Sequence, residues 1–197
     1  DGVDASVINS DGKGYYKVLI NKYFKYSDEI SQNIYKLKRN INNIDDVKIF
    51  SAEINDLERK ITLFHSNVVS EFTKKKDFGI DLIGFHGQTI LHSPKNKYSK
   101  QLGDGNLLSQ LSKKKVIFNF RQNDLFQGGE GAPLSPIFHQ LIVKEKKIDL
   151  PVCILNIGGI SNLTLIGDLK EENLISKDIG PGNCLIDEWM RRNKKGN

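Results

Sequence analysis

The stretch VCILNIGGISNLTLIG, residues 152–167, predicts two β-strands joined by a glycine turn. Near the start of the chain, VDASVIN and YYKVLINKYF flank the turn SDGKG and predict another hairpin. A hairpin opening each half predicts two related α/β halves, although no residue-level repeat is visible. We place the boundary in the charged segment KEKKIDLP, which gives domains 1–149 and 150–197.

Helix and strand patterns alternate between and after the hairpins. Ser27 is a candidate N-cap for the first of two helices with apolar stripes. We assign to the core the stripes Ile30, Ile34, Leu37 and Ile41, and Ile54, Leu57, Ile61, Phe64, Val68 and Phe72. Further along, the patterns predict strands in DLIGFHG, VIFNF and NLISKD, and helices in NLLSQLSKKK, over 137–143 and from Asn183. This alternation predicts an α/β fold with a parallel or mixed sheet.

Composition restricts the function classes. The chain has 197 residues, of which 38% are hydrophobic, and this predicts a soluble globular protein. It has no apolar run long enough to span a bilayer and no signal-peptide pattern, so we expect a cytoplasmic protein without a membrane partner. The net charge of +5 is dispersed, which argues against a nucleic-acid partner. Cys153 and Cys184 lack metal-ligand spacing, so we expect buried side chains and assign no direct protein metal ligand.

Glycine-containing loops are predicted at the strand ends, where open α/β sheets bind ligands. None matches a P-loop or a dinucleotide-binding fingerprint, so a phosphate site here needs another design. The five loops are DGVD at 1–4, GFHGQT at 84–89, FRQNDLFQGGEGAPL at 120–134, NIGGISN at 156–162 and DIGPGN at 178–183.

These segments resemble the successive motifs of the anhydro-N-acetylmuramic acid kinases. The matching stretches are DGVD, GFHGQTILHSP, LGDGNLL, FRQNDLFQGGEGAPLSPIFHQ, LNIGGISNLTLI and DIGPGNCLIDEW. The resemblance implies the actin, sugar-kinase and heat-shock-chaperone ATPase superfamily, in which two ribonuclease-H-like lobes clamp ATP. Compared with that family, the chain resembles a piece without the extreme N-terminus and the C-terminal half. We therefore expect a truncated second lobe with an exposed apolar face, and no activity from this piece alone.

The resemblance implies a cytoplasmic enzyme of cell-wall recycling that uses ATP and Mg²⁺, with homodimerisation as a family-level expectation. It would convert 1,6-anhydro-N-acetylmuramic acid to N-acetylmuramic acid 6-phosphate while water opens the anhydro ring. Asp178 matches the family's catalytic aspartate and would take a proton from that water. An alternative is that Asp178 caps its own turn. Asn183 is expected to cap the following helix.

For ATP and phosphate binding, the resemblance implies two groups of residues. Asp1, Gly2, Val3 and Asp4 match the tail of a nucleotide loop whose Gly-Thr-Ser part is missing here, and a carboxylate there would hold Mg²⁺ through water. Asn156, Gly158, Gly159 and Asn162 match a phosphate-facing hairpin. An ordinary tight hairpin is the alternative for the two glycines.

For the sugar, the resemblance implies contacts from His86, Gln88, Thr89, Arg121 and Asp124. A guanidinium grips a carboxylate with two parallel hydrogen bonds, so Arg121 would bind the lactyl carboxylate. Alternatively, Arg121 is a structural ion-pair partner and His86 supports another residue. The remaining histidines are assigned structural or surface positions. The chain departs from the family pattern at Glu130, Gln122 and Asn123.

Two other function classes compete with a kinase. A sugar-binding or regulatory module could keep the cleft without turnover, and sugar binding without ADP release would identify it. A nucleic-acid-binding protein would associate with mixed DNA or RNA in a strongly salt-dependent way. The sequence has no recognition motif or aromatic platform for that second class.

Overall fold

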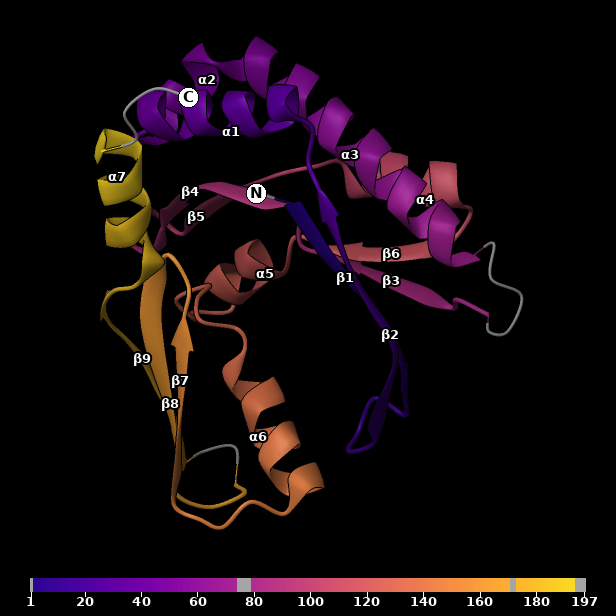
Figure 1. The fold of residues 1–197 in the computed structure, drawn as a ribbon, viewed down its shortest axis with the longest axis vertical. Helices are drawn as coiled ribbons and strands as arrows, with labels where there is room; N and C mark the ends of the chain where they lie inside the picture. Colours follow the sequence, from indigo (N-terminus) through magenta and orange to yellow (C-terminus); the bar gives the residue numbers. More distant parts are fainter. Residues whose placement is uncertain (1, 74–78, 171–172, 194–197) are drawn as a thin grey trace. The chain divides into compact units, whose positions relative to one another are not determined.

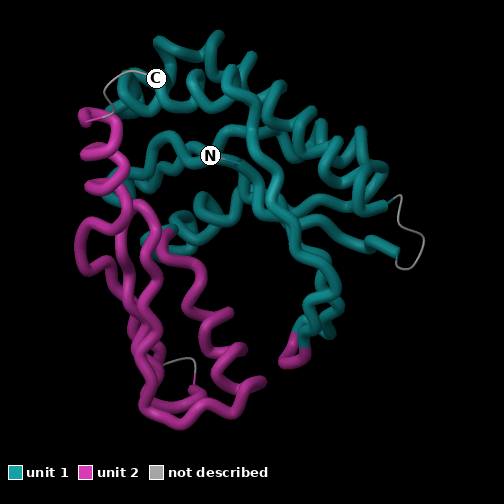
Figure 2. The backbone as a smooth tube through the Cα atoms, in the orientation of Figure 1, with its two compact units in different colours: residues 1–12, 16–131 teal, residues 13–15, 132–197 magenta. Residues whose placement is uncertain are grey.

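The structure, a computed structural model, describes residues 2–73, 79–170 and 173–193 (Figure 1). It is a mixed α/β protein, as predicted. The chain divides into two compact units: unit 1 is Asp1–Gly12 with Tyr16–Gly131, and unit 2 is Lys13–Tyr15 with Ala132–Asn197 (Figure 2). This division between Gly131 and Ala132 falls earlier in the chain than the predicted boundary between residues 149 and 150. The predicted boundary between two ribonuclease-H-like lobes stays a prediction.

The described part of unit 1 contains six strands in three pairs. They are β1 (Gly2–Ser10), β2 (Tyr16–Lys25), β3 (Leu82–Phe85), β4 (Gln88–Ser93), β5 (Tyr98–Leu102) and β6 (Lys115–Phe118). β1 pairs antiparallel with β2, which confirms the N-terminal hairpin, and β3 pairs parallel with β6. The antiparallel β4–β5 hairpin, joined through the 3₁₀ helix η1 (Pro94–Asn96), was not predicted. Lys97 in its turn adopts the left-handed backbone region, which residues other than glycine seldom adopt. The residue type at this position therefore gives no turn signal.

Five α-helices accompany these strands among the described residues of unit 1. They are α1 (Asp28–Asn40), α2 (Ile44–Ile49), α3 (Ser51–Thr73), α4 (Gly105–Ser112) and α5 (Phe120–Phe126). The predicted cap of α1 is confirmed, because the Ser27 hydroxyl accepts a hydrogen bond from the Ile30 N–H. Asn43 caps α2 in a capping box with Asp46, and Asp104 caps α4.

The core of unit 1 lies where α1 and α3 pack against each other and onto β1, β4 and β5. It confirms most of the predicted apolar stripes. The main cluster of buried residues is Tyr26, Ile30, Ile34, Leu37, Ile41, Ile54, Leu57, Ile61, Ile90 and Leu102. Burying each aliphatic side chain of this size contributes about 1.5–3 kcal/mol. Helical periodicity therefore located this core correctly.

The predicted loops of unit 1 are shorter than expected, and the strand predicted from Val3 onward is confirmed. Residues 120–126 form α5, so only the remainder of the 120–134 stretch is irregular. Gly2, Val3 and Asp4 are the first residues of β1 and pair with β2, while Asp1 lies outside the described residues.

Unit 2 is built on a three-stranded antiparallel sheet in the order β7-β8-β9. Its elements are α6 (Pro136–Lys146), β7 (Val152–Ile157), β8 (Ile160–Ile166), β9 (Leu174–Pro181) and α7 (Asn183–Asn193). The second predicted hairpin is confirmed as β7–β8. α6 covers the sheet face that carries Thr164 and Ile166, and His139 Nδ1 lies 2.8 Å from Thr164 Oγ1.

The other sheet face of unit 2 is apolar and exposed. Cys153, Leu165 and Ile175 form one cross-strand row on it, and Ile175 is 61% exposed. The expectation of a buried Cys153 is therefore wrong, because no described element covers its side of β7. On α7, Trp189 is 63% exposed. None of the described helices is both long and apolar enough to cross a membrane.

Candidate functional site

In unit 2, the sheet register brings three predicted site residues into one row. Asp178 on β9 pairs with Asn162 on β8, and Asn162 pairs with Asn156 on β7. Side chains of directly opposed residues lie on the same face of a sheet with Cβ atoms about 4.5–5.5 Å apart. Two motifs that are separate in sequence therefore present a carboxylate and two amides side by side.

Hydrogen bonds join the β7–β8 turn to the start of α7. The Asn183 N–H donates to the Gly158 carbonyl over 2.7 Å, and the Gly182 N–H donates to the Gly159 carbonyl over 2.9 Å. The Asn183 side-chain amide donates to the Ile157 carbonyl over 3.1 Å. The expected helix cap by Asn183 is therefore wrong, because this side chain binds the end of β7 instead.

The two turn glycines are not explained by packing. A Cβ at Gly159 would meet nothing within 4 Å, and neither Gly158 nor Gly159 has a positive φ. Within the described part of the chain, the N–H groups of both residues donate no backbone hydrogen bond. Glycine with free N–H groups allows close approach of an anion such as a phosphate, and the phosphate-binding role of this turn stays a prediction beside the ordinary hairpin.

Asp178 is exposed and lies within β9, five positions ahead of α7. Among residues 2–73, 79–170 and 173–193, no hydrogen bond or ion pair engages its carboxylate. The structure therefore gives no support to the alternative that Asp178 caps the turn. An accessible carboxylate with unused lone pairs can accept a proton from a nearby water.

In unit 1, hydrogen bonds connect three of the predicted sugar-binding residues through the loop that ends at Gly131. Arg121 donates from Nε to His86 Nε2 over 3.0 Å and from Nη1 to the Gly131 carbonyl over 2.9 Å. Asp124 Oδ2 accepts from the Gly131 N–H over 2.7 Å. Gly131 has a φ of +71°, where a side chain would be strained. Arg121 and Asp124, both on α5, thus hold the loop from two sides.

His86 is a neutral imidazole with a defined tautomer. Its Nδ1 lies 2.9 Å from the Gly87 carbonyl and must donate there, so Nε2 accepts from Arg121. Burial lowers the pKa of His86 and the Arg121 charge lowers it further, while the hydrogen bond to Gly87 opposes them. This arrangement supports the alternative in which His86 positions another residue, namely Arg121.

The other predicted sugar residues, Gln88 and Thr89, begin β4. Thr89 Oγ1 accepts a hydrogen bond from Gln101 Nε2 over 3.0 Å. Asp4, predicted near ATP, is exposed on β1 opposite Tyr23. The described residues contain no group of three or more His, Cys, Asp or Glu side chains that could hold a metal ion.

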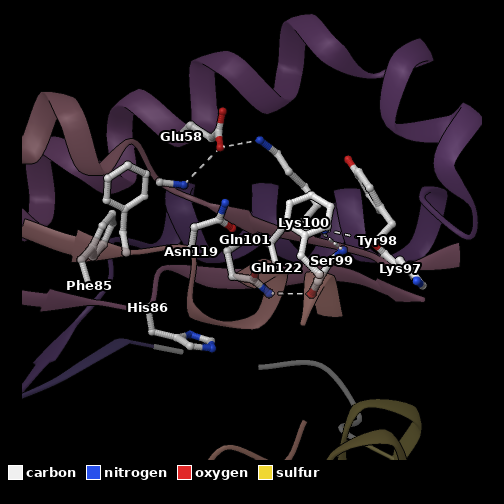
Figure 3. A pocket seen from close by; sticks show the side chains of 13 residues that line it. Glu58, Phe85, His86, Lys97, Tyr98, Ser99, Lys100, Gln101, Asn119 and Gln122 are labelled. Carbon is white, nitrogen blue, oxygen red and sulfur yellow. Dashed lines mark hydrogen bonds and ion pairs between the residues drawn. The ribbon is translucent and has the colours of Figure 1, made fainter. Parts of the chain in front are cut away.

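Unit 1 also has a cavity of about 440 Å³, within the size range of small-molecule sites (Figure 3). His86 is the only one of the predicted sugar residues that lines it. It is also lined by Glu58, whose Oε1 accepts from Lys100 Nζ over 2.8 Å and from the Gly103 N–H over 3.3 Å. The sequence analysis missed Glu58, because on a helix with an apolar stripe a glutamate is expected on the solvent side and matches no binding motif.

The family model for "Anhydro-N-acetylmuramic acid kinase" matches residues 1–197. The chain belongs to this family. An anhydro-N-acetylmuramic acid kinase of Pelagibacter ubique is 54% identical over 98% of the chain and 51% of that relative. Those of Agrobacterium fabrum and Brucella canis are 37% and 36% identical over 96% and 100% of the chain, and 52% and 53% of their own lengths. The chain thus spans about half the length of these curated relatives.

Proposed function

We propose that the protein, at the length of its relatives, phosphorylates 1,6-anhydro-N-acetylmuramic acid with ATP and opens its anhydro ring with water. Family membership supports this activity. The observation that carries it is the row in unit 2, which sets Asp178 beside Asn162 in the same hydrogen-bonded body as the Gly158–Gly159 turn. A base for water and donors for phosphate are what this reaction requires.

The substrate has no free 6-hydroxyl, because O6 is bonded to the anomeric carbon C1. The water oxygen forms a bond to C1 while the C1–O6 bond breaks, and O6 forms a bond to the γ-phosphorus while the bond from that phosphorus to ADP breaks. Asp178 accepts one water proton, and the other stays on the new C1 hydroxyl. General-base catalysis of this kind contributes roughly 10²–10⁴-fold to rate.

ATP phosphates would lie against the free N–H groups of Gly158 and Gly159, whose missing Cβ atoms permit close approach. Mg²⁺ supplies neutralisation of charge on the phosphates and is commonly held by one or two carboxylates together with phosphates and water. Asp4, an exposed carboxylate, would hold the ion through water. Binding of Mg²⁺ in this way requires no cluster of acidic side chains.

The sugar's lactyl carboxylate would bind the Arg121 guanidinium, which His86 and Gly131 already orient. Asp124, Gln88 and Thr89 would bind its hydroxyl and acetamido groups. We infer the two-lobed actin-like ATPase architecture, with domains 1–149 and 150–197, and a cytoplasmic homodimer from the family alone.

The test follows ADP release by the chain extended at both ends to the length of its relatives. Reactions contain ATP and Mg²⁺ with 1,6-anhydro-N-acetylmuramic acid, N-acetylmuramic acid, glucose or no sugar. We expect ADP release with the anhydro sugar alone. If no sugar stimulates ADP release while the anhydro sugar still binds, the kinase proposal is rejected in favour of a sugar-binding module.

A further inference from the structure

The side chain of Gln122 joins α5 to the start of β5. Its Oε1 accepts a hydrogen bond from the Ser99 N–H over 3.0 Å, and its Nε2 donates to the Lys97 carbonyl over 2.8 Å. All three residues line the cavity of unit 1 (Figure 3). One amide group thus uses both its acceptor and its donor on backbone groups that lie 23 and 25 positions away in the chain.

α5 depends on tertiary contacts of this kind for its orientation. It has seven residues, all of which the structure describes, and a helix this short is marginal on its own. Leu125 is the one buried residue among those seven, and the N-cap residue Asn119 makes no side-chain capping hydrogen bond. Among the described residues, the hydrogen bonds from α5 to β5 are the two made by Gln122. They therefore determine how α5 lies against that strand.

Arg121 and Gln122 point to different sides of α5, because successive residues are about 100° apart around a helix axis. The Arg121 guanidinium reaches His86 and the Gly131 carbonyl, whereas the Gln122 amide reaches β5. Rotation of α5 about its axis would shift both sets of contacts together. Hydrogen bonding of Gln122 to β5 therefore restricts the direction of the Arg121 guanidinium.

We propose that Gln122 is a positioning residue for sugar binding, a role that rests on the proposed function. It holds α5 on β5 and thereby orients the Arg121 guanidinium toward the lactyl carboxylate. Gln122 contacts neither the sugar nor ATP in this role. Two parallel hydrogen bonds to a carboxylate depend on the direction of the guanidinium fork, so loosening α5 weakens sugar binding and leaves ATP binding unchanged.

The experiment compares Gln122→Met and Gln122→Glu with the wild type in the extended protein. Methionine has the length and the helix propensity of glutamine, but its thioether cannot replace the amide hydrogen bonds. Glutamate keeps the acceptor for the Ser99 N–H and sets a carboxylate oxygen against the Lys97 carbonyl. Isothermal titration calorimetry measures Kd for 1,6-anhydro-N-acetylmuramic acid, and steady-state ADP release measures kcat and both KM values.

We expect both variants to raise Kd and KM for the sugar by roughly 3- to 10-fold, as loss of an ordinary hydrogen bond does. KM for ATP, and kcat at saturating sugar, should stay within about twofold, because no contact to ATP or to the reacting atoms is lost. This split between the two substrates distinguishes orientation of Arg121 from a general loss of structure.

A double-mutant cycle tests whether Gln122 acts through Arg121. In the Arg121→Lys background, Gln122→Met should change Kd for the sugar by less than about twofold, because no guanidinium fork remains to be oriented. Asn123→Ala is the matched control on the same helix. Asn123 is exposed and its side chain makes no hydrogen bond among the described residues, so this variant should keep the wild-type Kd.

Three results overturn the inference. One is a wild-type Kd for the sugar in Gln122→Met. Another is an equal fold-change in Kd on adding Gln122→Met to the wild type and to Arg121→Lys, which shows that Gln122 acts without Arg121. The third is a parallel rise in KM for sugar and ATP with a lowered melting temperature, which identifies a general structural role. Failure of the proposed function is distinct, because the wild type would then bind the anhydro sugar without releasing ADP, and calorimetry would still decide the role of Gln122.

Discussion

Unit 1 has a closed apolar core beneath two of its helices, whereas unit 2 leaves one face of its sheet apolar and open. In unit 1, Ile34 on α1 and Ile61 on α3 are fully buried in one apolar cluster. In unit 2, Ile175 and Trp189 are more than half exposed, and among the described elements α6 covers the opposite face of the sheet. Polar contacts nevertheless fix the glycine turn and the start of α7. The comparison teaches that local order at a site does not require a closed core around it.

The largest expected effect is on turnover and falls in unit 2. Replacing Asp178 with Asn should lower kcat of the extended protein by roughly 10²–10⁴-fold, because the amide cannot accept the water proton. Asp178 is exposed and its carboxylate makes no hydrogen bond among the described residues, so folding should be unchanged. Circular dichroism checks the fold, and retained turnover would reject the base.

The next effect is on stability and falls in unit 1. Leu57→Ala should lower the free energy of unfolding by about 2–5 kcal/mol, because Leu57 is 1% exposed in the core and the change leaves a cavity. Urea unfolding measures this value. A loss below about 1 kcal/mol would show that unit 1 is as loosely packed as the open face of unit 2.

Arg121→Lys is expected to act on sugar binding. Lysine loses the fork that reaches His86 and the Gly131 carbonyl, so it presents a charge without a fixed direction. Loss of charge-assisted hydrogen bonds of this kind corresponds to a roughly 10- to 100-fold rise in KM for the sugar. An unchanged KM for the sugar would instead assign Arg121 a structural role.

Unit 1 should lose stability in acid. Burial lowers the pKa of His65 and of His86 below the ordinary 6.5, so both are neutral in the fold. The unfolded state then binds more protons, and stability falls as pH drops from about 6.5 through the lowered folded-state pKa values. Urea midpoints between pH 8 and pH 5 measure the slope. His65→Gln should reduce the slope, and an unchanged slope would contradict the assignment.

The smallest effect is expected on the open face of unit 2. Ile175→Thr keeps a β-branched strand residue and removes little buried surface, so the free energy of unfolding of this chain should change by less than about 0.5 kcal/mol. Repeating the measurement on the extended protein sharpens the comparison. A loss of more than about 1 kcal/mol there would show that additional chain covers this face.

Sequence patterns predicted the two hairpins and the α1 and α3 core because these depend on periodicity within one segment. They failed at α5, whose short FRQNDLF sequence has no helical stripe, and at β4–β5, whose turn passes through Lys97 with positive φ. Cys153 was misplaced for a different reason. Alternation tells which strand residues share a face, and only packing determines whether another layer covers that face.

The sequence by itself determined the family, the two hairpins and the identity of the polar residues in each motif. The tertiary structure decided which of these residues are neighbours. It placed Asn162 opposite Asp178 and His86 within hydrogen-bond distance of Arg121. The physical reason is that the type of each side chain sets the chemistry of a motif. Strand register and loop closure depend instead on pairing between segments that are distant in the chain.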